Sequence, residues 1–119
     1  MSPISKVYFA SVRMAKAEAA ASLPAKFQRL LAKFNLARIC RGARVPIKMH
    51  LGGNLGYTTV HPLFVRLLAQ ALREAGGQPF VVEGGFGTVA QAAARGYTSE
   101  TVGCPIVAAG GAYDSHLVT

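Results

Sequence analysis

The sequence predicts an α/β fold, a Rossmann-like three-layer sandwich around a small and mostly parallel sheet. Three apolar, strand-like stretches each run into a glycine pair, at Gly52-Gly53, Gly84-Gly85 and Gly110-Gly111. Segments with helical periodicity fill the intervals between the pairs, and each interval is about as long as a strand–helix–strand unit. This alternation favours parallel strands joined by right-handed crossovers.

Composition is consistent with one folded domain over residues 1–119. Hydrophobic residues make up 51% of the chain, which is enough for a core and argues against disorder. No apolar run reaches the ~20 residues of a membrane helix, and the first residues lack the order of a signal peptide. Two cysteines do not make a disulfide framework, so we expect a cytoplasmic protein without a membrane partner.

The first third of the chain is expected to hold one strand and one helix. Residues 6–12 are rich in β-formers and predict a first strand. A loop with some helical turn follows over residues 13–21. Ser22 then has the character of an N-cap, with Pro24 in the first helical turn. The apolar stripe of this helix is Phe27, Leu30, Leu31 and Phe34.

Residues 45–51 alternate as a strand does. Their even and odd positions form two faces: Val45, Ile47, Met49 and Leu51 on one, and Pro46, Lys48 and His50 on the other. Pro46 has no N–H to donate, so it belongs at the start of the strand or on an unpaired side.

The remainder predicts two further strands and three helical segments. A helix opens at His61-Pro62 and stops at Gly76-Gly77. Its predicted buried stripe is Phe64, Leu67, Leu68, Ala71, Leu72 and Ala75. The other elements are a strand at 80–82, a helix at 88–95 ended by Gly96, a helical turn at 98–101, a strand at 106–109 and weak strand character at 112–119. No helix follows to cover the last strand, so we expect an incomplete N-terminal part of a larger domain, or a homo-oligomer.

The carboxyl ends of the strands are the expected ligand-binding edge, because open parallel sheets bind ligands there. Lys48 supplies a point charge, His50 a proton or a metal bond, and the start of the helix at Pro62 favours an anion. An ordinary solvated lysine and a half-buried histidine are the alternative. The predicted ligand-binding residues are Lys48, His50, Gly52, Gly53, Asn54, Thr58, Thr59, Glu83, Gly84 and Gly85.

Glu83 ends the second predicted strand and allows several roles. It can act as a base, a metal ligand, a ribose-binding group or a solvated carboxylate. The loop after it lacks the spacing of a Walker loop or a dinucleotide-binding fingerprint, and no Ser-His-Asp order is present. We assign no catalytic residue. Nor do we assign a metal, because His50, His61, Glu83 and His116 lack a local ligand spacing.

Basic residues give a formal charge of +8 and suggest a second kind of partner. Such a concentration attracts phosphate or nucleic acid, although charge runs are usually solvated helix faces. The aromatic residues of this stretch belong to the buried stripe, which makes base stacking unfavourable. The cluster consists of Lys16, Lys26, Arg29, Lys33, Arg38, Arg41 and Arg44.

One segment carries a family resemblance. The matching positions are residues 48–54, Thr58-Thr59, Pro62 and the helix to Gly76-Gly77. Their sequence resembles the domain-of-unknown-function family 362. Residues 79–83, 87–88, 95–97 and 103–107 extend the resemblance over most of residues 4–119, most strongly over 44–111. Family members tend to have Asp at the position of Glu83 and near the third glycine pair, where this chain has Ala108-Ala109.

The resemblance implies an association with iron–sulfur proteins. Longer family members carry closely spaced cysteines downstream that are suited to a 4Fe-4S cluster, and Cys40 and Cys104 cannot replace them. We therefore expect no cofactor in this chain. Three interpretations stay open at this point: a module that binds a small anionic ligand, a nucleic-acid-binding module, and a truncated product without activity.

Overall fold

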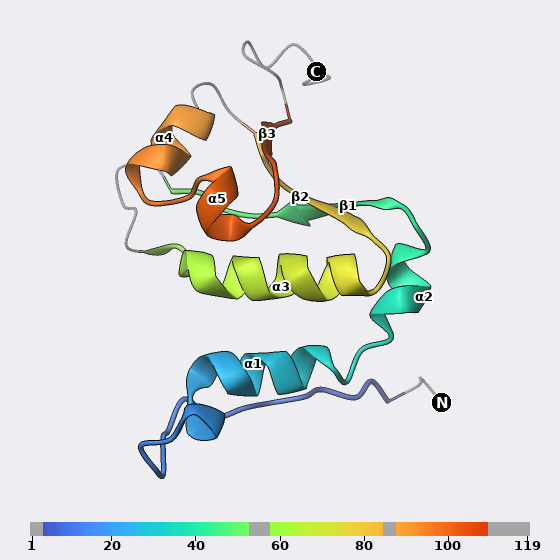
Figure 1. The fold of residues 1–119 in the computed structure, drawn as a ribbon, viewed down its shortest axis with the longest axis vertical. Coiled ribbons are helices and arrows are strands. Elements are labelled where there is room, and N and C mark those ends of the chain that lie inside the picture. Colours follow the sequence, from blue (N-terminus) through green and yellow to red (C-terminus); the bar gives the residue numbers. More distant parts are fainter. Residues whose placement is uncertain (1–3, 53–57, 85–87, 110–119) are drawn as a thin grey trace. The chain divides into compact units, whose positions relative to one another are not determined.

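The computed structural model describes residues 4–52, 58–84 and 88–109 (Figure 1). The chain forms two compact units, one ending at Asn35 and one beginning at Leu36, and each is described by itself. Several predicted features lie outside the described residues: Gly53, Asn54, Gly85, Gly110-Gly111, His116 and the segment 112–119. The single domain over 1–119 stays a prediction.

The second unit contains a three-stranded parallel sheet in the order β1-β2-β3. Its strands are β1 (Arg44–Lys48), β2 (Gln78–Glu83) and β3 (Ile106–Ala108). Ile47 pairs with Val81, and Val81 pairs with Ile106, so the register runs straight across the sheet. Pro46 lies on the edge strand β1, as its missing N–H predicts. The small α/β fold with parallel strands is confirmed.

Helix α2 (Leu36–Cys40) precedes β1, α3 (Pro62–Glu74) connects β1 to β2, and α4 (Thr88–Ala94) and α5 (Ser99–Val102) connect β2 to β3. Helix α3 starts where predicted, with Pro62 in its first turn. It ends at Glu74, and Gly76 follows with a φ of 87°, a conformation that favours glycine. Helix α5 has a capping box, in which Thr98 and Thr101 bond each other's backbone N–H.

The core lies between the sheet and α3. Val81 is fully buried at the centre of the sheet, and Val65, Ala69 and Leu72 face it from α3. Of the stripe predicted for this helix only Leu72 is fully buried, so the prediction was rotated by about one residue. The periodicity located the amphipathic helix, but packing against the sheet decided which line of side chains makes the closest contact.

The two faces of the sheet differ in burial. Helices α3 and α5 lie on the same side, where the Arg66 side chain bonds the Glu100 carbonyl at 2.7 Å. On the opposite face Pro46 is exposed, Val107 is 45% exposed, and Phe80 and Val82 are only half-buried. The third layer of the predicted sandwich would lie on this face. The described helices of the second unit leave it open.

The first unit has a short 3-10 turn (Ala19–Ala21) followed by α1 (Leu23–Leu31). Ser22 caps α1 by accepting a bond from the Ala25 N–H, as predicted, and Pro24 lies in the first turn. The helix ends before Phe34, which is 52% exposed and makes an edge-to-face contact with Tyr8. The predicted stripe therefore extends one turn too far.

The predicted strand at 6–12 is wrong. These residues form no regular element, and Val7 and Phe9 are 88% and 87% exposed. A strand requires a partner for its backbone, and no backbone hydrogen bond joins residues 4–10 to the rest of the described chain. The sheet thus has three strands among the described residues, not four.

Helix length and polarity also bear on the membrane prediction. Within the ranges that the structure describes, no helix is both long enough and apolar enough to cross a bilayer.

Candidate functional site

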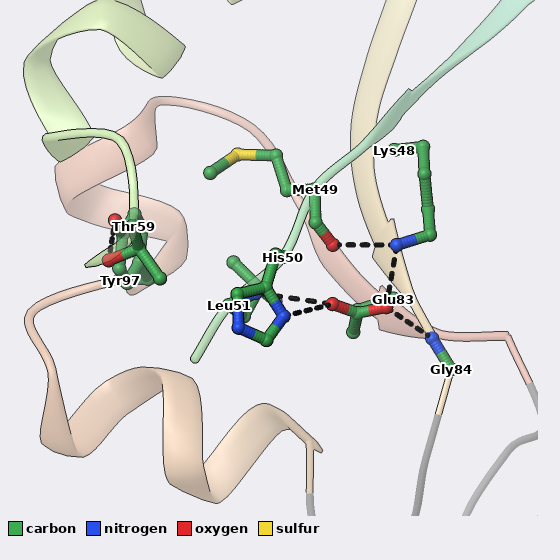
Figure 2. Close-up of polar contacts among 8 residues, drawn as sticks. All are labelled: Lys48, Met49, His50, Leu51, Thr59, Glu83, Gly84 and Tyr97. Atoms are coloured by element: carbon green, nitrogen blue, oxygen red, sulfur yellow. Dashed lines mark hydrogen bonds and ion pairs between the residues drawn. The ribbon is translucent and has the colours of Figure 1, made fainter. Parts of the chain in front are cut away.

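The candidate site lies at the carboxyl ends of β1 and β2, where Glu83 forms its centre. Lys48 pairs with Val82 in the parallel register, so the side chains of Lys48 and Glu83 leave adjacent strands at nearly the same level. Figure 2 shows the Lys48 amine, the His50 ring and the backbone N–H groups of Leu51 and Gly84 directed at the Glu83 carboxylate. Sequence alternation had placed Lys48 and His50 on one side of the chain, and the structure confirms that they come together.

Glu83 is held by contacts to both of its oxygens. Lys48 Nζ lies 2.7 Å from Oε1, which also accepts a bond from the Gly84 N–H at 3.2 Å. The Leu51 N–H donates to Oε2 at 3.2 Å, and His50 Nδ1 lies 3.6 Å from the same atom. The carboxylate is only 18% exposed, whereas the side chains of Lys48 and His50 are each 68% exposed. The anion is therefore inside the cluster, and its basic partners are at the surface.

These contacts keep Glu83 ionised. Partial burial raises the pKa of its carboxyl group, but the hydrogen bond and charge of Lys48 and the N–H groups of Leu51 and Gly84 lower the pKa by more. The net pKa lies below its ordinary value because the donors favour the charged form. Glu83 is thus a carboxylate at neutral pH and a poor general acid.

Lys48 and His50 retain capacity for a ligand. The lysine amine has three N–H donors, and two are directed at the Met49 carbonyl at 3.0 Å and at Glu83. The His50 nitrogen that does not face Glu83 points away from the carboxylate (Figure 2). A carboxylate that holds one side of an imidazole orients the other nitrogen toward a ligand or a proton.

The remaining predicted residues form a separate group or lie at its border. Thr59 accepts a 2.7 Å bond from the Tyr97 hydroxyl, which also bonds the Val60 carbonyl. Thr58 is exposed, and Gly52 has a φ of 86°. Gly84 has open space where a Cβ would lie, so its small size leaves room beside Glu83. No bond joins the Tyr97 pair to the Glu83 cluster among the residues drawn in Figure 2.

The start of α3 is less available to an anion than its sequence indicates. His61 Nδ1 accepts a 3.1 Å hydrogen bond from the Leu63 N–H, so the side chain of the preceding residue caps the helix. One of the unpaired N–H groups of the first turn is thereby used. The N-terminus of α3 contributes less to the site than Lys48 and His50.

Sequence reasoning missed two contributors to the site. The Leu51 N–H follows the strand and could be expected only from the parallel pairing, which brings the chain past the end of β2. Tyr97 is 2% exposed, and its hydroxyl bonds Thr59, which lies 38 positions earlier in the chain. A buried tyrosine hydroxyl requires a hydrogen-bond partner, so a tyrosine expected in the core indicates that a polar group lies near it.

An iron–sulfur cluster does not fit the described residues. Cys40 and Cys104 are free and buried, and burial raises the pKa of the Cys104 thiol more than the Val81 backbone and the Arg73 charge lower it. A cluster requires several thiolates close together. In residues 4–52, 58–84 and 88–109 no three His, Cys, Asp or Glu side chains gather as a metal site would need.

Two cations of the predicted nucleic-acid-binding stretch are used within the first unit. Lys26 Nζ donates to the carbonyls of Ser11 and Arg13, and Arg29 donates to the Ala20 carbonyl at 2.9 Å. These bonds attach the N-terminal loop to α1 and reduce the number of cations that are free for phosphate. Nucleic-acid binding stays a prediction.

Comparison with known proteins places the site within a family. Residues 45–118, more than half of the chain, match the model of a domain of unknown function (DUF362). The matched region contains β1 from Val45 onward, α3, β2 and the whole Glu83 cluster. Neither the curated proteins nor the solved structures include a significant match. The chain therefore belongs to the DUF362 family, as the sequence of the segment from Lys48 to Asn54 had indicated.

Proposed function

We propose that the carboxyl edge of β1 and β2 binds a small oxyanion, a carboxylate or a phosphate. Lys48 and His50 would contact the ligand, and Glu83 would hold both in place. The observation that carries the proposal is the convergence of an exposed ammonium and an exposed imidazole on one partly buried carboxylate. A ligand on an α/β sheet is expected at this edge.

The structure supports this division of roles through exposure and bonding. A carboxylate with several donors costs little to keep ionised, and it fixes the long lysine side chain before a ligand arrives. The glycines on both strand ends, Gly52 and Gly84, leave space for the backbone to approach a ligand. The proposal keeps Gly53, Asn54, Thr58, Thr59 and Gly85 among the ligand-binding residues.

The binding proposal is tested by titration with inorganic phosphate, citrate and a nucleoside monophosphate, monitored by thermal shift and by calorimetry. Lys48→Ala should abolish most of the response. Lys33→Ala is the matched control, because it removes the same charge from an exposed position in the other unit. Equal loss in both variants, or no response of the wild type to any of the probes, would contradict the proposal.

We further propose that the module belongs to a redox-associated, cytoplasmic protein. The family resemblance supports the iron–sulfur association, and the two free cysteines suit a reducing compartment. Because the described cysteines do not form a cluster site, any cluster would have to come from residues other than these two. If these two cysteines hold no cluster, iron analysis of the purified chain should find no stoichiometric iron.

A further inference from the structure

A pocket lies on the sheet face away from α3, toward the amino-terminal ends of β1 and β2. Its volume is about 380 Å³, within the range of small-molecule sites. Four lining residues come from the starts of β1 and β2, one precedes β3 and one lies within β3: Arg44, Gln78, Pro79, Phe80, Pro105 and Val107.

The parallel register explains how this pocket forms. Arg44 pairs with Gln78, and Pro46 pairs with Phe80, so their side chains lie on the face that α3 does not cover. Val107 pairs with Val82 and lies on that face too. Sheets of parallel strands are normally covered on both faces. The half-buried ring of Phe80 is thus the floor of an apolar surface that no described helix of the second unit covers.

Arg44 gives the pocket a charge preference. Its guanidinium makes no ion pair or hydrogen bond with the described residues. The six residues that line the pocket include no acidic side chain. A guanidinium presents paired donors that match a carboxylate. The pocket therefore combines an apolar floor with an unpaired cation at its border.

We propose that this pocket binds a small carboxylate with an apolar body, such as a medium-chain fatty acid or an arylalkanoic acid. The apolar part would cover Phe80, Pro105 and Val107, and the carboxylate would pair with Arg44. A bare phosphate would leave the apolar lining in water. A second copy of the chain packed symmetrically over this pocket would bring the Arg44 guanidinium groups of both copies together, which disfavours a dimer.

The test uses the full chain and two probes, octanoate and its neutral counterpart octanamide. Binding is followed by shifts of the backbone amide signals of Gln78, Phe80 and Val107 in ¹H–¹⁵N spectra. Octanoate should shift these signals at millimolar concentration and octanamide should bind more weakly. Arg44→Gln should weaken octanoate binding about tenfold and remove its advantage over octanamide, because a charge-assisted pair is lost.

Two further variants keep the result interpretable. Val107→Asp places a carboxylate in the pocket at an exposed position and should abolish octanoate binding while the fold is retained, as shown by circular dichroism. Lys33→Ala removes an exposed lysine of the first unit and should leave the octanoate-induced shifts of Gln78, Phe80 and Val107 unchanged, which separates recognition by Arg44 from a general effect of charge. Failure of phosphate binding leaves this inference intact.

Three outcomes would overturn the inference. The first is the absence of any shift with octanoate. The second is equal binding of octanoate and octanamide by the wild type, which would mean apolar adsorption without recognition by Arg44. The third is a dimer in sedimentation in which the backbone amides of Phe80 and Val107 are protected from hydrogen exchange, which would show that another copy covers the face.

Discussion

Two segments have strand-like sequences, residues 6–12 and residues 45–51, but only the second contributes a strand to the sheet. In the second segment Ile47 is 9% exposed and pairs with Val81 in the sheet. In the first, Val7 and Phe9 remain almost fully exposed. Both have β-forming residues, so local propensity does not separate them. The difference is a neighbouring strand and a helix that covers one face.

The sharpest test of this comparison pairs Ile47→Ala with Phe9→Ala. Ile47→Ala removes a core side chain and should cost about 2–5 kcal/mol of unfolding free energy. Phe9→Ala should change it by no more than about 0.5 kcal/mol, because the ring is already in water. Urea unfolding measures both. A large loss for Phe9→Ala would show that residues 6–12 are buried in solution.

The next largest effect on stability is expected at Gly77, in the turn between α3 and β2. A Cβ at Gly77 would lie 3.0 Å from both Cys40 Cβ and Cys40 Sγ and 3.1 Å from the Leu72 carbonyl. Gly77→Ala should therefore cost about 1–3 kcal/mol through overpacking. Gly84→Ala is the matched control, since nothing lies within 4 Å of its Cβ position. Equal melting temperatures of the two variants would contradict this account.

Much of the paired region could be predicted because its signals are local. The alternation of Val45 to Leu51, the proline at Pro62 and the glycine at Gly76 each act through the backbone of a few residues. The approach of Lys48 to Glu83 followed from parallel pairing. By contrast, the fate of residues 6–12 depends on a partner strand that the segment itself does not encode, and a β-rich composition was insufficient.

The site shows the same limit. Sequence reasoning proposed Lys48, His50 and Glu83 as ligand-binding groups, and the structure makes Glu83 the internal partner of the other two. The Leu51 N–H and the Tyr97 hydroxyl were missed, since both depend on the path of the chain beyond the end of an element. Capping of α3 by His61 was also missed, although the proline that follows it marks that position.

A variant that removes a charge tests the contacts at the carboxyl end of the segment 45–51. Glu83→Gln should cost about 1 kcal/mol at neutral pH, because the Leu51 and Gly84 N–H groups lose a charged acceptor. Most of this cost comes from the backbone donors, since Lys48 is exposed and its ion pair is screened by water. Chemical denaturation measures the difference between the two proteins.

The pH dependence of that difference has a definite sign. The pKa of Glu83 is lowered from its ordinary 4.5 in the folded protein, so ionisation favours the folded state. The stabilisation is fully present above pH 4.5 and is lost as the pH falls through the lowered pKa. The wild type and Glu83→Gln should therefore converge in stability in acid. A constant gap down to the lowest pH at which both fold would contradict the assignment.

The smallest expected effect compares one helix cap from each unit. Ser22 accepts the Ala25 N–H at 3.4 Å, a long bond, whereas Thr98 accepts the Thr101 N–H at 3.2 Å and its own N–H bonds Thr101 Oγ1 at 2.8 Å. Thr98→Ala removes the 3.2 Å bond but keeps the bond of the Thr98 N–H, whereas Ser22→Ala removes only the long and weaker bond. Thr98→Ala should cost about 1 kcal/mol and Ser22→Ala about 0.5 kcal/mol, at the low end for N-caps.

Amide hydrogen exchange in α5 and in α1 reports each loss locally. The reverse order would mean that the helix in the first unit depends more on its cap than the geometry of Ser22 indicates.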